Sequence, residues 1–288
     1  MKYFSSLIFV FISMSACATD FYLKPGAEDL DGTKYYTLTA KNPYGQKNID
    51  IALEGNANMV TIRDQLTFSC KWGTVEGVRV GMSSQTGDGV MTVYSYYFFD
   101  EKLANIFAKS YAVMNAKKPY IPLSLNHSVC GHERESVKKD DRTGRDYVET
   151  YEVIADGPFA LKGVPNVHIK YVTEKGLNLV KESELGDVIV DTYKNKDNLS
   201  PVNLSVFFIN ISSGMNIVNL ISWGDLADSH NMVCYKVYAY TYDRTGNISK
   251  NVDINDDVNL SGCEGKGAKF NYKNAALIKY YLKKKFKE

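Results

Sequence analysis

Long hydrophobic runs are almost absent from this sequence of 288 residues. The one extended apolar stretch covers residues 3–14 and is shorter than the roughly 20 residues that a membrane-spanning helix needs. Lys2 precedes this stretch and the small residues of Ser15–Ala18 follow it, which is the pattern of an export signal. We therefore predict that residues 1–18 are a signal peptide and that the protein is exported without a helical anchor.

Two cleavage sites fit the end of this signal. Small residues on both sides of Cys17 allow cleavage before Thr19, which would release the protein into the periplasm or the medium. The segment Met14–Cys17 also resembles a bacterial lipobox. Cleavage before Cys17 would make this cysteine the lipid-carrying first residue of an outer-membrane lipoprotein, whose only contact with the membrane would be that lipid.

A net charge of either sign is also lacking, because 34 basic side chains stand against 33 acidic ones. A protein that binds nucleic acid mainly through phosphates carries a clear positive excess, so we expect no nucleic-acid partner. The chain is rich instead in aromatic residues, with 21 Tyr and 13 Phe. These side chains suit the half-buried surface of a β-sheet.

Closely spaced cysteine pairs of the Cys-x-x-Cys type are missing, which argues against a thiolate metal site. Beyond the signal the sequence holds four cysteines, an even number that suits two disulfides outside the reducing cytosol: Cys70, Cys130, Cys234 and Cys263. Three pairings are open. We favour Cys70–Cys130 and Cys234–Cys263, which close the more local loops, and each bridge should stabilise the fold by about 2–4 kcal/mol.

Recognised catalytic motifs are missing as well. The sequence has no Gly-x-Ser-x-Gly elbow, no His-Glu-x-x-His pair and no glycine-rich phosphate loop. One stretch does gather His127, Cys130, His132, Glu133 and Glu135, but its spacing fits no metalloprotease, and a disulfide would remove Cys130 as a ligand. We therefore name no catalytic residue and favour a protein that is not an enzyme.

Alternating apolar and polar residues, broken by Gly, Asn and Asp, predict many strands. The predicted strands are 34–40, 49–53, 60–70, 75–82, 90–99, 146–154, 167–173, 187–193, 202–211, 215–221, 232–242 and 248–254. Helical spacing predicts two amphipathic helices, at about 101–117 after the capping residue Asp100 and at 271–286. The expected fold class is α+β, predominantly antiparallel β, with these two helices and two disulfides.

A polar stretch before Pro201 is typical of a linker between domains. We predict a β-rich domain with one helix in residues 19–197 and a smaller β-rich domain ending in a helix in residues 198–288. A long loop inside a single domain would give the same pattern.

The tetrapeptide Asp-Arg-Thr-Gly occurs twice, at Asp141–Gly144 and at Asp243–Gly246. An aspartate that bonds back to the backbone and a glycine with positive φ are typical of tight turns. We expect a tight hairpin turn at each copy.

Residues 253–264 resemble an EF-hand calcium loop. Oxygen-bearing side chains recur at the spacing that calcium ligands need, at Asp253, Asn255, Asp257, Asn259 and Glu264. The loop's obligatory glycine is replaced by Val258, however, and no helical pattern precedes it. We favour an acidic connecting loop held by Cys263, with calcium as the alternative, and expect no other cofactor.

Tyr238, Tyr240 and Tyr242 lie at alternate positions of a predicted strand and therefore share one face of it. If that face is exposed, the row is a candidate binding face for a glycan or a protein. The interpretation we prefer is packing between neighbouring strands.

Two functions of different classes fit these expectations. The first is an exported binding or accessory protein of the cell envelope, of inhibitor or immunity type, with an unknown protein or glycan as its partner. The second is a secreted hydrolase that acts on envelope polymers. The export signal, the paired cysteines and the missing catalytic motifs favour binding.

Overall fold

The computed structural model describes residues 18–28, 34–52, 57–86, 89–116, 118–131, 138–139, 146–147, 151–196, 198–224, 232–265 and 269–286. The predicted signal peptide lies outside these ranges up to and including Cys17. So do His132, Glu133 and Glu135, and the first copy of the repeated tetrapeptide.

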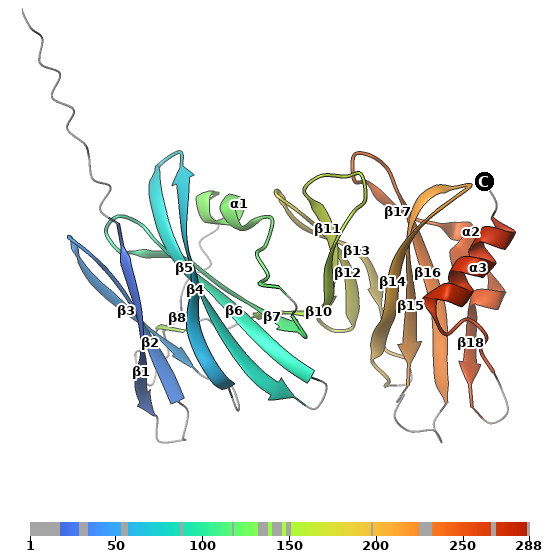
Figure 1. Cartoon of the computed structure of the whole chain (residues 1–288), viewed down its shortest axis with the longest axis horizontal. Helices are drawn as coiled ribbons and strands as arrows, with labels where there is room; N and C mark the ends of the chain where they lie inside the picture. The colour runs from blue at the N-terminus through green and yellow to red at the C-terminus, as the bar shows by residue number, and fades with distance from the viewer. Residues whose placement is uncertain are drawn as a thin grey trace, which may run out of the picture.

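Strands dominate the described chain (Figure 1). They are β1 (Asp20–Glu28), β2 (Lys34–Asn42), β3 (Gly45–Ala52), β4 (Ala57–Cys70), β5 (Gly73–Thr86), β6 (Gly89–Phe99), β7 (Asn105–Met114), β8 (Lys138–Lys139), β9 (Asp146–Tyr147), β10 (Tyr151–Ala160), β11 (Val167–Thr173), β12 (Leu177–Ser183), β13 (Gly186–Tyr193), β14 (Pro201–Ile211), β15 (Gly214–Trp223), β16 (Val233–Tyr242), β17 (Ile248–Lys250) and β18 (Ser261–Glu264). The helices are α1 (Leu125–Cys130), α2 (Val252–Asn255) and α3 (Ala275–Lys285), with a 3-10 turn at Val258–Leu260.

The larger strands form three sheets. The first has the order β1-β2-β3, the second β13-β12-β11-β10-β7-β6-β5-β4, and the third β14-β15-β16-β17, with β18 also paired to β16. The pairings in these sheets are antiparallel except that of β7 with β10, which is parallel. A parallel pair needs a long crossover, and here the chain that carries α1 supplies it.

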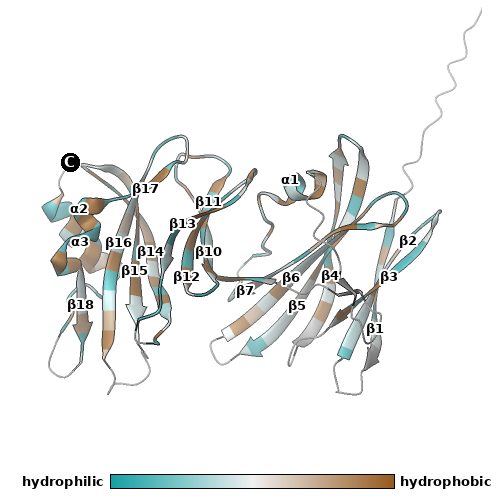
Figure 2. Ribbon diagram, turned by 180° about the vertical axis from the view of Figure 1, so that it is seen from behind, coloured by the Kyte–Doolittle hydropathy of each residue, from teal (hydrophilic) through white to brown (hydrophobic). Residues whose placement is uncertain are grey.

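The eight-stranded sheet joins two layered halves of the molecule (Figure 1). In the first half, one face of β4–β7 packs on the β1–β3 sheet and the other packs on α1. In the second half, β11–β13 pack on one face of the third sheet, and α2 and α3 cover its other face. Apolar residues accordingly recur along the strands of both halves and on α2 and α3 (Figure 2). The fold is thus β-dominated and mostly antiparallel, as predicted.

The helix predicted at 101–117 is wrong, because this segment forms β7. Both faces of β7 are covered, so buried residues occupy consecutive positions and mimic a helical pattern. Asp100 does bond to nearby amides, of Lys102 at 2.9 Å and Ala104 at 2.8 Å, but it closes the turn between β6 and β7.

The C-terminal segment does contain a helix, α3, which begins later than predicted. Asn274 caps it by accepting a hydrogen bond from the amide of Leu277 at 3.0 Å. Ile278 and Leu282 are the residues it buries on the sheet. The strand predicted at 248–254 ends at Lys250, and α2 follows it.

Both predicted disulfides are confirmed. Cys70–Cys130 joins the end of β4 to the end of α1. Cys234–Cys263 joins β16 to β18 at positions that face each other in the sheet. The two bridges close loops of 60 and 29 residues.

The turn predicted at Asp243–Gly246 is also confirmed. The Asp243 carboxylate accepts hydrogen bonds from the amide of Thr245 at 2.8 Å, its hydroxyl at 2.6 Å and the amide of Asn247 at 3.0 Å. Gly246 has a φ of 81°. The bonds from Thr245 and Asn247 lower the pKa of Asp243 to about 2.

The third sheet begins at Pro201, close to the predicted domain boundary, yet it shares a core with β11–β13. Tyr171 and Tyr193 of the eight-stranded sheet lie in this core with Ile217 and Tyr240 of the third sheet. The division into two domains stays a prediction.

Candidate functional site

A cluster of charged residues is buried on the face of the eight-stranded sheet that packs beneath the α1 segment. Lys170 of β11 and Glu182 of β12 have no exposed surface. The ammonium nitrogen of Lys170 lies 2.5 Å from Oε1 of Glu152, 2.7 Å from Oδ2 of Asp187 and 3.8 Å from Oε1 of Glu182. Four neighbouring strands, β10 to β13, therefore meet at one lysine.

Tyr120, from the segment that leads to α1, completes the cluster. Its hydroxyl donates to Oε1 of Glu182 at 2.5 Å and accepts from the ammonium of Lys170 at 3.0 Å. Burial, followed by the charge of Glu182, raises the pKa of Tyr120, so the hydroxyl keeps the proton that it donates. The backbone carbonyl of Tyr120 accepts from the hydroxyl of Tyr96, which ties the segment to β6.

Lys170 remains protonated in this setting. Burial by itself favours the neutral amine, but the carboxylates of Glu152, Asp187 and Glu182 outweigh it and raise the pKa of Lys170. His168 lies at the border of the cluster, with Nδ1 3.5 Å from Oε2 of Glu182. Lys170 and Glu182 are closed to solvent, and the ion pairs of Lys170 connect four neighbouring strands.

The sequence carries a signal for this cluster that motif analysis missed. Lys170 stands between the buried residues Ile169 and Tyr171, and Glu182 lies two positions after the buried Val180. Charged residues at such inward positions need partners of opposite charge. His168 belongs to the same face as Lys170.

The predicted calcium ligands have other partners in the structure. Asp257 accepts hydrogen bonds from Lys285 at 2.8 Å and from the hydroxyl of Tyr281 at 2.7 Å. Asn255 bonds the backbone of Ala239. The remaining contacts pair Asn259 with Asp257 and Glu264 with Lys273, and Asp253 lies on α2.

These partners hold Asp257 in its ionised form. Burial works against its charge, but the bonds from Lys285, Tyr281 and Asn259 outweigh burial and lower the pKa of Asp257. In the described ranges, no group of three or more His, Cys, Asp or Glu residues is arranged to hold a metal ion. Calcium at this loop stays the untested alternative, and binding there would have to displace the bonds to Asp257.

The tyrosine row does not form an exposed binding face. Tyr240 has no exposed surface and Tyr242 is 8% exposed. Both lie in the core between the third sheet and β11–β13, and Tyr238 packs against this core. The face they share is covered because the two sheets stack on it, so the row acts in packing.

A cavity of about 620 Å³ lies beside α1 and the Cys70–Cys130 disulfide. His127, Lys71 and Glu184 are among the residues that line it. Glu184 accepts a hydrogen bond from Asn166 at 2.7 Å. Cys130 also lines the cavity but is held in the disulfide, whereas His132, Glu133 and Glu135 lie outside the described residues, so an acid–base site here stays a prediction.

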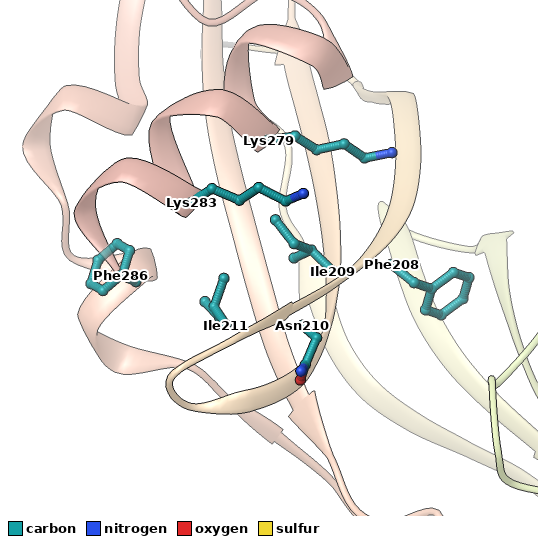
Figure 3. Close-up of a pocket in the computed structure, with 7 residues that line it drawn as sticks. All are labelled: Phe208, Ile209, Asn210, Ile211, Lys279, Lys283 and Phe286. Carbon is teal, nitrogen blue, oxygen red and sulfur yellow. The ribbon is translucent and has the colours of Figure 1, made fainter. Parts of the chain in front are cut away.

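A second hollow, of about 670 Å³, runs between β14 and α3 (Figure 3). It is lined by Phe208, Ile209, Asn210 and Ile211 of the strand and by Lys279, Lys283 and Phe286 at the helix. We call it the β14–α3 groove. The sequence contains no local signal for this groove, because its strand and its helix lie about 70 residues apart in the chain.

In the part of the chain that the structure describes, none of the helices has the length and hydrophobicity needed to cross a membrane.

Comparisons with known proteins leave the chain without a family. No family model matches it, and no curated protein matches it. Among solved structures it is similar to the α-L-arabinofuranosidase Arb93A from Fusarium graminearum in complex with an iminosugar inhibitor, with a TM-score of 0.22 and 12% identity over 80% of this chain and 66% of that one. It is also similar to the complex of the fission yeast SREBP–SCAP binding domains, with a TM-score of 0.19 and 11% identity over 80% of this chain and 51% of that one. This chain thus spans just under two thirds of the first structure, and likenesses at these TM-scores carry no argument about fold or function.

Proposed function

We propose that this protein is an exported binding or accessory protein of the cell envelope, of inhibitor or immunity type. The observation that carries the proposal is the pair of disulfides, Cys70–Cys130 and Cys234–Cys263. Disulfides of this kind persist in proteins that fold outside the reducing cytosol. They agree with the export signal predicted in residues 1–18, which would direct the protein to the periplasm or, if Cys17 is lipidated, to the outer membrane.

The state of the charged groups supports binding over catalysis. A catalytic pair must reach its substrate, whereas Lys170 and Glu182 have no exposed surface and Asp257 is held by Lys285 and Tyr281. The sheets and their two disulfides instead form a rigid frame. A rigid frame lowers the entropy cost of binding, because the binding surface is already ordered before the partner arrives.

The test uses the mature, disulfide-bonded protein as immobilised bait for envelope extract, with a reduced and alkylated preparation as the control. We expect one envelope protein or glycan to be retained by the oxidised bait alone and to bind saturably once purified. Release of fragments from envelope polymers, without a retained partner, would contradict the proposal and favour the hydrolase.

A further inference from the structure

Strand β14 forms an outer edge of the third sheet. Its one partner strand in the described chain is β15, and its other side carries no strand. Alternate residues of such an edge direct their N–H and C=O groups away from the sheet. An edge of this kind can pair with an added strand.

Charged side chains, a common protection of an exposed edge, are absent from β14. Proteins commonly block exposed edges with charged side chains. Residues Pro201–Ile211 contain no charged residue, and the only proline stands at the first position. The proline and a register shift between Asn203 and Ser205 interrupt the first half of the strand, whereas Val206–Ile211 pairs regularly with β15 and carries neither protection.

The β14–α3 groove follows this edge. Four consecutive strand residues line it, and consecutive strand residues point to opposite faces, so the hollow runs along the side of the strand rather than over one face. In Figure 3, Ile209 and Ile211 point toward α3, whereas Phe208 and Asn210 point away from it. The groove is bounded near the β14–β15 turn, where the Ser212 amide approaches the carbonyl of Phe286 at 3.5 Å.

The charge of the groove is positive. Lys279 and Lys283 lie one turn apart on α3, and both side chains extend toward β14 (Figure 3). None of the described residues that line the groove is acidic. In the described chain neither lysine has an ion pair, whereas their neighbour Lys285 is paired with Asp257 at 2.8 Å. Lys279 instead lies over the ring of Phe207, 4.8 Å from its centroid.

We infer that the β14–α3 groove binds an extended acidic segment of a partner protein as an added strand, an inference that rests on the proposed binding function. The backbone of that segment would pair with the outer side of β14. Its acidic side chains would lie at alternate positions, about 6–7 Å apart. This spacing is close to the roughly 6 Å that separates residues one helical turn apart, such as Lys279 and Lys283. The other alternate positions would be apolar.

A peptide explains the site better than a membrane surface. Lipid headgroups offer charge to Lys279 and Lys283 but have no row of amides to pair with an edge strand. The groove is also confined to one strand and one helix. An anionic membrane is therefore kept as a competing outcome of the test.

The experiment measures binding of a synthetic peptide of alternating glutamate and valine to the mature, disulfide-bonded protein. We expect saturable binding that falls at least about tenfold in Lys279→Glu/Lys283→Glu. Lys269→Glu/Lys284→Glu changes the net charge equally on exposed lysines outside the groove and should bind within about twofold of the wild type. Thermal unfolding of both variants verifies that they fold.

A backbone-methylated peptide tests whether strand pairing holds the ligand, and phosphatidylglycerol vesicles test the competing membrane surface. Methylating the backbone nitrogens of alternate peptide residues keeps every charge but prevents strand pairing, so this peptide should not bind. Equal binding of the methylated peptide, equal loss in both double variants, or tighter binding of the protein to phosphatidylglycerol vesicles would overturn the inference. If the envelope component captured by the wild type is also retained by Lys279→Glu/Lys283→Glu, the groove is not the binding site but the proposed binding function stands. If the wild type captures nothing, the proposed function itself fails.

Discussion

Tyr193 of β13 and Tyr240 of β16 meet hydroxyl to hydroxyl between the eight-stranded sheet and the third sheet, with their oxygens 2.8 Å apart. Tyr240 donates to Oδ2 of Asp191 at 2.6 Å, and Asn219 donates to the hydroxyl of Tyr193 at 3.0 Å. Lys250 pairs with the same aspartate oxygen at 2.9 Å. This small network bonds the two halves of the shared core to each other.

Replacing Tyr240→Phe should therefore destabilise the protein by about 1–3 kcal/mol, because buried polar groups lose a partner while the ring stays in place. Tyr238→Phe is the matched control. It lies in the same row but has no hydrogen bond in this network, so we expect a change below about 0.5 kcal/mol. Chemical denaturation measures the free energy of unfolding of both variants. Equal losses would show that the hydrogen-bond network does not stabilise the fold.

Replacing Lys170→Met should cost about 3–5 kcal/mol, because the carboxylates of Glu152, Glu182 and Asp187 would face one another without the central ammonium. Lys162→Met, on the exposed chain after β10, serves as the control and should be nearly neutral. Denaturant titration gives both values. Unchanged stability in Lys170→Met would show that the buried cluster does not hold β10–β13 together.

Stability should fall as the pH rises above about 10. Burial raises the pKa of Tyr96 and of Tyr238 to about 12, against 10.0 for a free tyrosine. Between these values the unfolded chain loses protons that the folded chain keeps, which favours unfolding. Lys170 acts in the same direction, since its raised pKa gives stability that is present at lower pH and lost as the pH passes through that value.

Tyrosinate absorbance and circular dichroism, followed together against pH, test this. We expect the buried tyrosines to ionise only as the fold is lost. Ionisation of all the tyrosines near pH 10 in a protein that stays folded would contradict it.

Calcium titration calorimetry tests the loop at 253–264. Because Asp257 is bonded to Lys285 and Tyr281, we expect no binding heat in the wild type and no difference in Asp253→Ala. Binding heat that is present in the wild type and lost in Asp253→Ala would show that calcium does bind at this loop.

The sequence was informative where its signals are local. The cysteine pairing followed from loop length, and the turn at Asp243–Gly246 followed from residues that bond within the turn. The residue pattern of β7 imitates a helix because both of its faces are covered, by segments that strand order brings to it. The partners of Lys170 and the edge position of β14 likewise depend on strand order, which alternation of residue types does not encode.

The burial of Tyr240 shows the same limit. Period-two spacing correctly places it on one face with Tyr238 and Tyr242, but whether that face meets solvent or another sheet is decided by β11–β13.

The most direct test of the account is the mass of the protein recovered from its native cell, measured intact and after digestion without reduction. We predict a chain that begins at Thr19, or at a lipidated Cys17, and that carries the bridges Cys70–Cys130 and Cys234–Cys263. A chain that still begins at Met1, with four cysteines free to react with an alkylating agent, would contradict export and with it the proposed role at the cell envelope.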